Sequence, residues 1–337
     1  MADPTTTHTP RTILVTGGCG FIGSCYVRQL LGGQDDQDIT VTNLDKLTYS
    51  GNPANVAEVA GDPRYSFIEG DIRDHATVRQ AMAGADTVVH FAAEAQVDKS
   101  ITGPEVFTTT NVLGTQVLLD AARQQDVARF HYVSTDEVYG HLGEQGSFTE
   151  ATPLAPNSPY SASKAGGDLL CRAYFRTFGF PATVTRCSNN YGPYPRMDNL
   201  IPVLTGKALA GEPLPLYGDG SNVRDWLYVE DHCAAIEAVV CRGRAGEVYN
   251  VGGHTERTNL EVAKLVLAEL GQPESLIEFV ADRPGHDKRY AIDASKIKAE
   301  LGWEPAHRFA EALPATVRWY AEHPEWVEAA NNRLKKK

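Results

Sequence analysis

The chain has 337 residues, of which 42% are hydrophobic and 22% are charged, and its formal net charge is −12. A chain of this length can bury a substantial core, in one large domain or in two closely joined ones. The acidic balance argues against nucleic acid as a partner, because nucleic-acid-binding proteins present basic surfaces. No apolar run approaches the roughly 20 residues that span a bilayer, so we expect no membrane partner.

The six cysteines and the two ends of the chain give further limits. The cysteines form no Cys-x-x-Cys pair and lie mostly inside apolar segments, so we expect the reduced thiols of a cytoplasmic protein and no metal site. Residues 1–10 are polar and lack the apolar segment of a signal peptide. We expect residues 1–10 and 331–337 to be flexible tails.

The N-terminal segment has the pattern of a dinucleotide-binding site. A short apolar strand, 12–16, leads into a Gly-x-x-Gly-x-x-Gly turn at 17–23 and an apolar helix, 21–31. Glycines at this spacing permit a tight turn and let the backbone approach a pyrophosphate at the helix N-terminus. Asp45 ends the next strand, 39–44, where a carboxylate accepts hydrogen bonds from the adenosine ribose and repels a 2′-phosphate. We therefore predict NAD as the cofactor rather than NADP.

Up to residue 187, short apolar strands alternate with longer amphipathic segments. Strands are predicted at 12–16, 39–44, 66–69, 87–91, 129–134 and 182–187, and helices near 21–31, 76–82, 106–124 and 160–178. Such alternation is typical of an α/β protein with a Rossmann-type doubly wound parallel sheet. We therefore assign 11–187 to an NAD-binding Rossmann domain.

After residue 187 proline and glycine become frequent, and the predicted elements become shorter. Helices are expected near 200–210, 260–270 and 309–321, and strands near 214–217 and 247–251. We assign 188–330 mainly to a smaller C-terminal α/β lobe that binds the substrate. The two parts interleave, because segments near 223–252 return to the first domain.

Reactive side chains gather at two places in the first domain. Thr135, Asp136 and Glu137 place a hydroxyl and two carboxyl groups at the end of an apolar strand. Tyr160 and Lys164 form the Tyr-x-x-x-Lys pair by which short-chain dehydrogenases remove a hydroxyl proton during hydride transfer to nicotinamide. Since one base suffices for that oxidation, the carboxyl groups indicate a second proton transfer, such as an elimination requires. The simpler alternatives are a solvated turn for the carboxyl groups and a surface pair for the tyrosine and the lysine.

From Thr12 to Tyr320 the chain resembles the extended short-chain dehydrogenases/reductases, and among them the dTDP-glucose 4,6-dehydratases. The matching stretches are 45–49, 70–74, 91–94, 134–140, 160–164, 188–194, 222–226 and 282–287. The epimerases of this superfamily usually carry small residues in place of Asp136 and Glu137, and the decarboxylases usually keep only the second carboxylate. The pair therefore favours a dehydratase.

The resemblance implies NAD-dependent conversion of dTDP-glucose to dTDP-4-keto-6-deoxyglucose, in deoxysugar biosynthesis. Tyr160, with a pKa lowered by Lys164 and by the nicotinamide cation, takes the proton of the sugar 4-hydroxyl as hydride leaves C4 for NAD. Thr135 binds the same oxygen. Glu137 removes the C5 proton, protonated Asp136 donates to the departing 6-hydroxyl, and hydride returns to C6.

The resemblance also implies two sets of binding residues. The set for NAD is Gly17, Gly20, Phe21, Ile22, Gly23, Asp45, Lys46, Leu47, Thr48, Asp71, Ile72, Phe91, Ala92, Ala93, Thr110, Tyr160, Lys164 and Asn190. The set for the substrate is Ala95, Thr135, Asn189, Asn199, Leu200, Pro215, Tyr217, Arg224, Asn259, Asp282, His286 and Tyr290. We prefer a bidentate contact of Arg224 with substrate phosphate to the alternative that it pairs with a carboxylate. His286 and Tyr290 could instead be packed loop residues.

Three residues depart from the usual pattern of the family. Ala95 and Gln96 stand where serine and histidine are common, and Asn199 stands where lysine is common. A hydroxyl and a positive charge are therefore missing from the expected pocket, unless Lys99 or Arg196 supplies the charge. The exact nucleotide and hexose stay open for this reason.

Segments 106–124 and 160–178 are apolar on more than one face. We expect a homodimer through them, the alternative being that the protein's own core covers both. For function, the alternatives are an epimerase or decarboxylase acting on a related nucleotide sugar, and a dinucleotide-binding protein without catalysis. The complete set of five reactive groups argues against the last.

Overall fold

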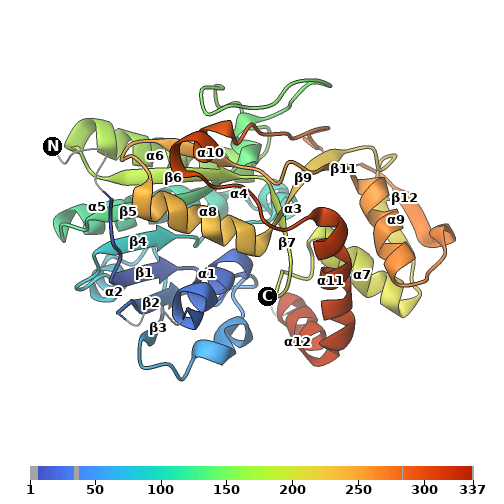
Figure 1. Cartoon of the computed structure of the whole chain (residues 1–337), viewed down its shortest axis with the longest axis horizontal. Helices are drawn as coiled ribbons and strands as arrows, with labels where there is room; N and C mark the ends of the chain where they lie inside the picture. Colours follow the sequence, from blue (N-terminus) through green and yellow to red (C-terminus); the bar gives the residue numbers. More distant parts are fainter. Residues whose placement is uncertain (1–6, 34–37, 283, 336–337) are drawn as a thin grey trace.

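A seven-stranded parallel sheet forms the centre of the protein (Figure 1), in the order β10-β6-β5-β4-β1-β2-β3. The computed structural model describes residues 7–33, 38–282 and 284–335. The strands are β1 Thr12–Thr16, β2 Thr40–Asp45, β3 Tyr65–Glu69, β4 Thr87–His90, β5 Arg129–Thr135, β6 Ala182–Cys187 and β10 Val248–Val251. Successive side chains of a strand point to opposite faces, and both faces are buried here: Leu14 lies in one hydrophobic cluster, Ile13 and Val15 in another.

Helices cover both faces of this sheet. One face carries α1 Phe21–Gly32 and α8 Val229–Arg242, and the other carries α2 His75–Ala81, α5 Thr115–Gln124 and α6 Pro159–Phe178. The predicted Rossmann-type doubly wound sheet is thus confirmed. Strand β10 and helix α8 follow the first elements of the second lobe in sequence, yet both pack on the large sheet.

The predicted single helix at 106–124 is interrupted in the structure. It consists of α4 Pro104–Thr108, a π-helical segment η2 Thr109–Gly114, and α5. Within the π-helical segment, the Asn111 side chain accepts from the Glu94 main-chain N–H at 2.8 Å and donates to the Glu94 carbonyl at 2.9 Å. A wider turn of this kind is frequent at functional sites, and this one carries Thr110 to the central cleft.

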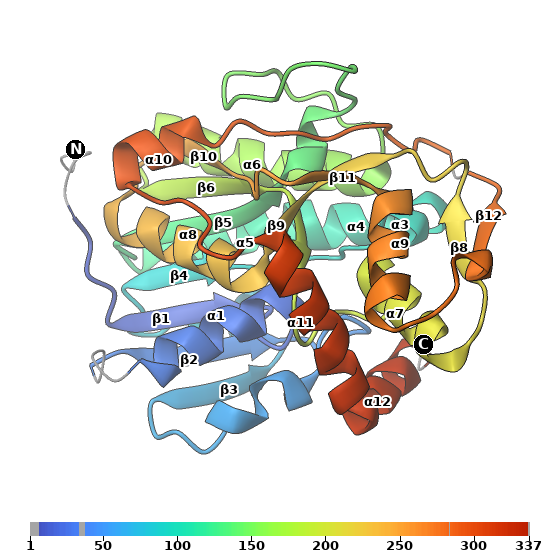
Figure 2. The same cartoon turned by 45° about the vertical axis from the view of Figure 1, so that its right-hand side comes forward.

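The smaller lobe lies at one end of the sheet, beyond the carboxyl ends of its strands (Figure 2). Its strands are β7 Asn189–Tyr191, β8 Leu214–Tyr217, β9 Val223–Tyr228, β11 Glu256–Thr258 and β12 Ile277–Val280, in two small sheets. Its helices are α7 Leu200–Ala210, α9 Asn259–Glu269, α11 Phe309–Glu322 and α12 Pro324–Lys335. The remaining elements are η1 Pro53–Val59, α3 Val97–Thr102, η3 Asp136–Tyr139, η4 Glu274–Leu276 and α10 Ser295–Leu301.

Parts of both expected tails are anchored. The main-chain N–H of His8 donates to the Cys241 carbonyl at 2.7 Å, so the end of the first tail is held against helix α8. Helix α12 runs to Lys335, and the Arg333 guanidinium donates to the Gly51 carbonyl at 2.6 Å. The described parts of both segments thus make contacts with the rest of the protein, and the flexibility expected of residues 1–10 and 331–337 stays a prediction. Residues 1–6 and 336–337 lie outside the described part of the chain.

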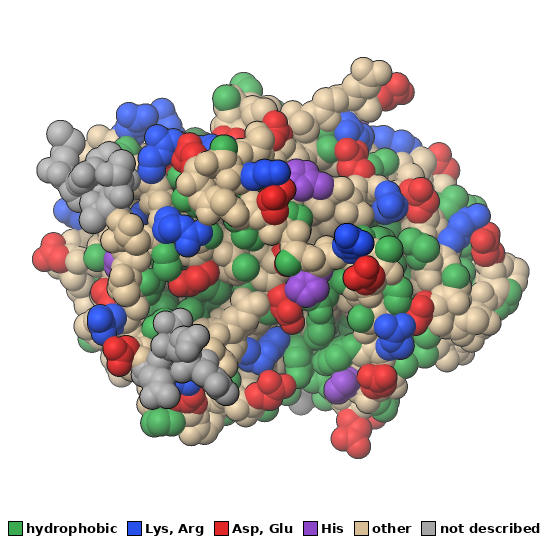
Figure 3. Space-filling model, viewed as in Figure 1, with side chains coloured by type: hydrophobic (Ala, Val, Ile, Leu, Met, Phe, Trp, Pro, Cys, Tyr) green, Lys and Arg blue, Asp and Glu red, His purple; other side chains and the backbone are tan. Residues whose placement is uncertain are grey.

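The surface carries charges of both signs. Lys and Arg side chains are interspersed with Asp and Glu over the face drawn in Figure 3. Among the described residues, no helix combines the length and the apolar character that crossing a membrane would require.

Candidate active site

A cleft of about 370 Å³ lies at the carboxyl ends of the central strands. Folds of this class bind ligands at that edge of the sheet, and the volume suits a small-molecule site. Most of the residues expected to bind NAD line it, namely Gly17, Gly20, Phe21, Ile22, Gly23, Asp45, Lys46, Thr48, Asp71, Ile72, Phe91, Ala92, Ala93, Thr110, Tyr160, Lys164 and Asn190. Leu47 is outside the lining.

The glycine turn leaves no room for side chains. A Cβ added at Gly17, where φ is +75°, would lie 2.7 Å from the Ala92 nitrogen, and one at Gly23 would lie 2.3 Å from the Gly17 carbonyl oxygen. Backbone is thereby exposed to the cleft at the start of α1, as a pyrophosphate site requires. Asp45 is fastened to this turn, because its carboxylate accepts from the Cys19 N–H at 2.9 Å and from the Leu47 N–H at 2.8 Å. These residues fit a dinucleotide.

A second carboxylate at the cofactor end of the cleft is ionised. Burial opposes the charge on Asp71, but hydrogen bonds from Arg73 and Lys46 hold the pKa of the carboxyl well below its usual range. The Lys46 ammonium lies 2.9 Å from the carboxylate and the Arg73 guanidinium 2.7 Å from it. Asp71 is therefore a hydrogen-bond acceptor at neutral pH.

The two carboxyl groups that follow β5 occupy different environments. The Thr135 hydroxyl caps the turn η3 by accepting from the Glu137 N–H at 3.3 Å. Asp136 is 2% exposed, and burial, followed by the Glu137 and Asp225 charges, raises its pKa well above the usual value. Glu137 is only partly buried and accepts from the Ser161 hydroxyl at 3.1 Å. The pair thus combines a carboxyl group whose raised pKa favours the protonated form with one that is partly exposed and hydrogen-bonded, as coupled acid and base chemistry requires.

Helix α6 brings the tyrosine and the lysine to the same cleft. The Ser158 hydroxyl caps its N-terminus by accepting from the Ser161 N–H at 3.0 Å, which puts Tyr160 in the first turn. Lys164 follows one turn later, where its ammonium donates to the Val133 carbonyl at 2.7 Å. Burial lowers the pKa of Lys164 to about 8.

The expectation that Lys164 and the nicotinamide cation lower the pKa of Tyr160 concerns the enzyme with bound NAD, and it stays a prediction. Burial raises the pKa of the phenol well above its usual value, and the Glu137 carboxylate raises it further. The protein groups around the phenol thus oppose its ionisation, since a buried anion beside another anion is unfavourable. The Arg196 guanidinium acts in the opposite direction and lowers the pKa of Tyr160.

Several residues that line the cleft carry a buried polar atom without a hydrogen-bond partner among the described residues. Between β5 and α6 these atoms are the Ser134 hydroxyl oxygen and Oδ2 of Asp136. Buried polar atoms are nearly always paired in native proteins. Their position indicates that a polar ligand completes the site between β5 and α6.

The residues expected to bind substrate fall into two groups. Ala95, Thr135, Asn189, Asn199 and Leu200 line the cleft. Those outside its lining are Pro215, Tyr217, Arg224, Asn259, Asp282, His286 and Tyr290.

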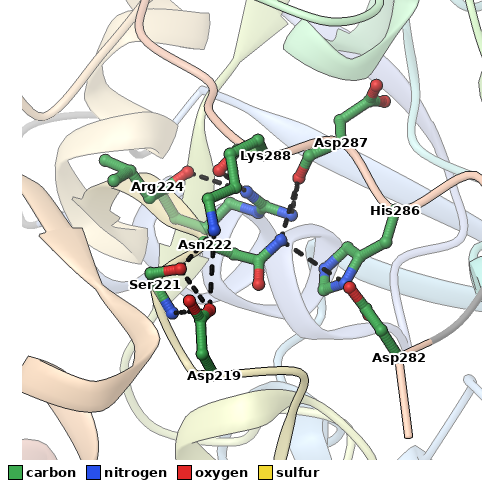
Figure 4. Close-up of polar contacts among 9 residues, drawn as sticks. Asp219, Ser221, Asn222, Arg224, Asp282, His286, Asp287 and Lys288 are labelled. Carbon is green, nitrogen blue, oxygen red and sulfur yellow. Dashed lines mark hydrogen bonds and ion pairs between the residues drawn. The ribbon is translucent and has the colours of Figure 1, made fainter. Parts of the chain in front are cut away.

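Several residues of the second group meet at the start of β9 (Figure 4). The Arg224 guanidinium donates to the main-chain carbonyl of Asp287 at 2.9 Å and lies 4.5 Å from the centre of the Tyr290 ring. His286 and Asp282 approach to 2.6 Å through Nδ1 and Oδ1. The structure therefore places Arg224 against main-chain carbonyls of the 282–290 loop.

Arg196 is a cation of the cleft that the sequence offered only as an alternative. It lines the cleft beside Asn199, forms an ion pair with Asp198, and donates to the Ser50 hydroxyl at 3.5 Å. The other candidate, Lys99, lies outside the lining, with its ammonium 3.3 Å from the centre of the Tyr49 ring. Arg196 is therefore the better placed of the two.

Other residues of the cleft were missed by the sequence analysis. Glu94, Trp226 and Tyr320 line it from three separate elements. Glu94 directly follows the 91–93 segment, so its position in sequence was a usable signal. Trp226 enters from β9 and lies in the matching stretch 222–226, whereas Tyr320 enters from α11 and no local pattern distinguishes it. Among the described residues, no group of three or more His, Cys, Asp and Glu side chains is arranged to hold a metal ion.

Comparison with known proteins agrees with this geometry. Residues 14–316 match the family model described as GDP-mannose 4,6 dehydratase. A dTDP-glucose 4,6-dehydratase of Xanthomonas campestris pv. campestris (strain B100) is 53% identical, over 94% of this chain and 95% of the relative. The dTDP-glucose 4,6-dehydratase of Streptomyces griseus is 55% identical, over 96% and 97%.

The chain belongs to the dTDP-glucose 4,6-dehydratase family. The solved structure of DesIV, a dTDP-glucose 4,6-dehydratase from Streptomyces venezuelae with NAD and a dTDP ligand bound, superimposes with a TM-score of 0.92. It is 53% identical and covers 95% of this chain and 99% of its own. The resemblance seen in the sequence is thus confirmed, and membership of this family favours a dehydratase over an epimerase or a decarboxylase.

Proposed function

We propose that the protein is an NAD-dependent dTDP-glucose 4,6-dehydratase, which forms dTDP-4-keto-6-deoxyglucose and water. The observation that carries the proposal is the convergence of Asp136, Glu137 and Tyr160 on one cleft with the glycine turn and Asp45. A dehydrogenase needs only the tyrosine, whereas an elimination needs an acid and a base as well.

Each reactive group then has one task. When bound, NAD supplies the hydride chemistry, taking hydride from C4 and returning it to C6. Tyr160 takes the proton of the 4-hydroxyl, and Thr135 holds the same oxygen. The resulting ketone acidifies the C5 proton, which Glu137 removes. Asp136, kept protonated by burial, gives its proton to the 6-hydroxyl as it leaves.

The test is turnover of the purified holoenzyme on a panel of nucleoside-diphosphate hexoses that includes dTDP-glucose, UDP-glucose and GDP-mannose. We expect dTDP-glucose to give a product lighter by one water molecule, with no added reductant. A product of unchanged mass and inverted configuration would assign an epimerase instead. If only another member of the panel loses water, the protein is still a dehydratase, but its substrate is not dTDP-glucose.

We infer that Arg196 supplies the positive charge that Asn199 lacks. A charge-assisted hydrogen bond contributes about 1.5–3 kcal/mol, which corresponds to roughly ten- to 150-fold in affinity. Arg196→Gln should therefore raise the KM for dTDP-glucose by about that factor, and Lys99→Gln should leave it within about twofold. Asn199→Lys combined with Ala95→Ser should not lower the KM. If that double variant lowers the KM several-fold, the pocket lacks a charge that Arg196 does not replace.

We also propose that the protein forms a homodimer through residues 106–124 and 160–178, which lie in α4, η2, α5 and α6. Four apolar side chains on these segments are 39–53% exposed, namely Val106, Leu113, Leu169 and Phe178. Burying such a surface against a second copy removes it from water. Leu113→Glu with Leu169→Glu should convert a dimer to a monomer in light scattering. Leu209→Glu, at an apolar residue that is 45% exposed on α7, is the matched control. A monomeric wild-type protein would contradict the proposal.

We also place the protein in the cytoplasm, in deoxysugar biosynthesis. All six cysteines are free thiols, and five of them are buried, which fits a reducing compartment. Fractionation of cells that produce the protein, with activity measured in each fraction, tests the location. Recovery of the activity outside the cytoplasm would contradict it.

A further inference from the structure

The loop that follows Asp45 is held from behind by the C-terminal helix α12. Nη2 of Arg333 donates to the Gly51 carbonyl at 2.6 Å, and Nε1 of Trp326 donates to the Asn55 side-chain oxygen at 3.1 Å. Gly51 lines the cleft, whereas Trp326 and Arg333 lie behind the loop, in the wall of a separate small cavity. Helix α12 thus reaches the rim of the cofactor cleft without lining it.

Asn55 transmits this contact to the glycine turn. It is 4% exposed, and its amide nitrogen donates to the Cys19 carbonyl at 3.2 Å. The same carbonyl accepts from the main-chain N–H of Asn52 at 2.8 Å. Cys19 in turn donates its main-chain N–H to Asp45. An unbroken chain of contacts therefore runs from Trp326 to the Asp45 carboxylate, the group expected to accept hydrogen bonds from the adenosine ribose.

The second contact of α12 acts on the same carboxylate by packing and by charge. A Cβ added at Gly51 would lie only 2.6 Å from Oδ1 of Asp45, so the loop is pressed directly against the carboxylate. Burial raises the pKa of Asp45, while the N–H groups of Leu47 and Cys19 and the charge of Arg333 lower it. Arg333 therefore supports both the position and the ionised state of this group.

Helix α12 is itself well anchored. The Trp326 ring packs edge-on against Trp319 of α11 and against Tyr194, with ring centres 5.1 Å and 5.6 Å apart. Aromatic contacts of this geometry fix the indole and hence the direction of its N–H. Figure 1 shows α12 lying against α11 at the end of the chain.

We propose that α12 is a clamp on the cofactor site, in which Trp326 and Arg333 position the 46–55 loop and thereby set how slowly NAD dissociates. These two are positioning residues, since they act through Asn55 and Gly51. The proposal rests on NAD binding and is independent of which sugar the enzyme uses. An enzyme that takes hydride and returns it in every cycle gains from holding its cofactor between turnovers.

The experiment follows release of NAD from the holoenzyme, by timed gel filtration and assay of the nucleotide that stays bound. Trp326→Phe removes the N–H and keeps an aromatic ring, and Arg333→Ala removes the contact with Gly51. We expect each variant to release NAD about three- to tenfold faster, which is the change in rate that the loss of one hydrogen bond would cause. An excess of NAD in the assay should restore the kcat of both variants to the wild-type value. Glu328→Ala and Asn332→Ala, both exposed on α12, should release NAD at the wild-type rate.

Two results would overturn the proposal. One is wild-type NAD release from both variants, whether or not the melting temperature falls, because a purely structural helix would change stability alone. The other result concerns the rate at which the double variant Asn55→Ala with Trp326→Phe releases NAD. If both residues act along one path, the double variant should release NAD no faster than Asn55→Ala alone. Fully additive effects would mean that Trp326 acts elsewhere.

Discussion

Tyr160→Phe should suppress the whole reaction, including transient reduction of the bound cofactor when dTDP-glucose is added. In the proposed mechanism the phenol takes the 4-hydroxyl proton, and every later step depends on the ketone formed there. Loss of a positioned general base lowers the rate by about 10²–10⁴-fold. The measurements are the rate of 4-keto sugar formation and the absorbance of NADH in a single turnover.

Tyr174→Phe is the matched control for this prediction. Tyr174 lies on the same helix, and its hydroxyl donates to Asp120 at 2.7 Å, away from the cleft. It should keep near-native activity. Substantial turnover in Tyr160→Phe would mean that another group takes the hydroxyl proton, and the role assigned to the Tyr-x-x-x-Lys pair would be wrong.

Replacing either carboxyl group should separate oxidation from elimination. Glu137→Gln should still permit some reduction of bound NAD by the sugar, but it should block water loss and exchange of the C5 proton with solvent. Asp136→Asn should keep C5 exchange and slow departure of the 6-hydroxyl by about 10²–10⁴-fold, the loss expected for a positioned acid. Burial and the neighbouring carboxylates raise the pKa of the Asp136 carboxyl, which favours the protonated form that a donor needs.

Single-turnover absorbance reports the oxidation, and proton exchange in deuterated water reports the C5 step. Ser161→Ala offers a graded version of the same test, because it removes the donor to Glu137 and keeps both carboxyl groups. It should slow C5 exchange more than NAD reduction. Near-native dehydration in both carboxyl variants would contradict the dehydratase proposal and favour an epimerase.

What the sequence could predict was local. The glycine turn, Asp45 and the Tyr160–Lys164 spacing each depend on a few adjacent residues, because a turn without side chains or one helical turn is encoded within the segment itself. Thr135, Asp136 and Glu137 follow from the end of a single strand. All of them reach one cleft, since parallel strands end at the same edge of the sheet.

What the sequence could not predict depends on contacts between distant segments. Trp326 and Asn55 are 271 positions apart, and nothing in the polar C-terminal segment indicates that α12 packs under the cofactor loop. The π-helical segment depends on Asn111 binding the main chain of Glu94. The pKa of Tyr160 depends on burial and on the Glu137 carboxylate, neither of which is visible in the Tyr-x-x-x-Lys spacing.

The most direct test of the proposed mechanism follows one hydrogen atom. The holoenzyme is given dTDP-glucose that carries deuterium at C4, in ordinary water and without added cofactor. Because hydride leaves C4 and returns to C6 within one active site, the 4-keto-6-deoxy product should carry the deuterium at C6. Deuterium lost to the solvent, or retained at C4 in a product that has lost no water, would contradict the account.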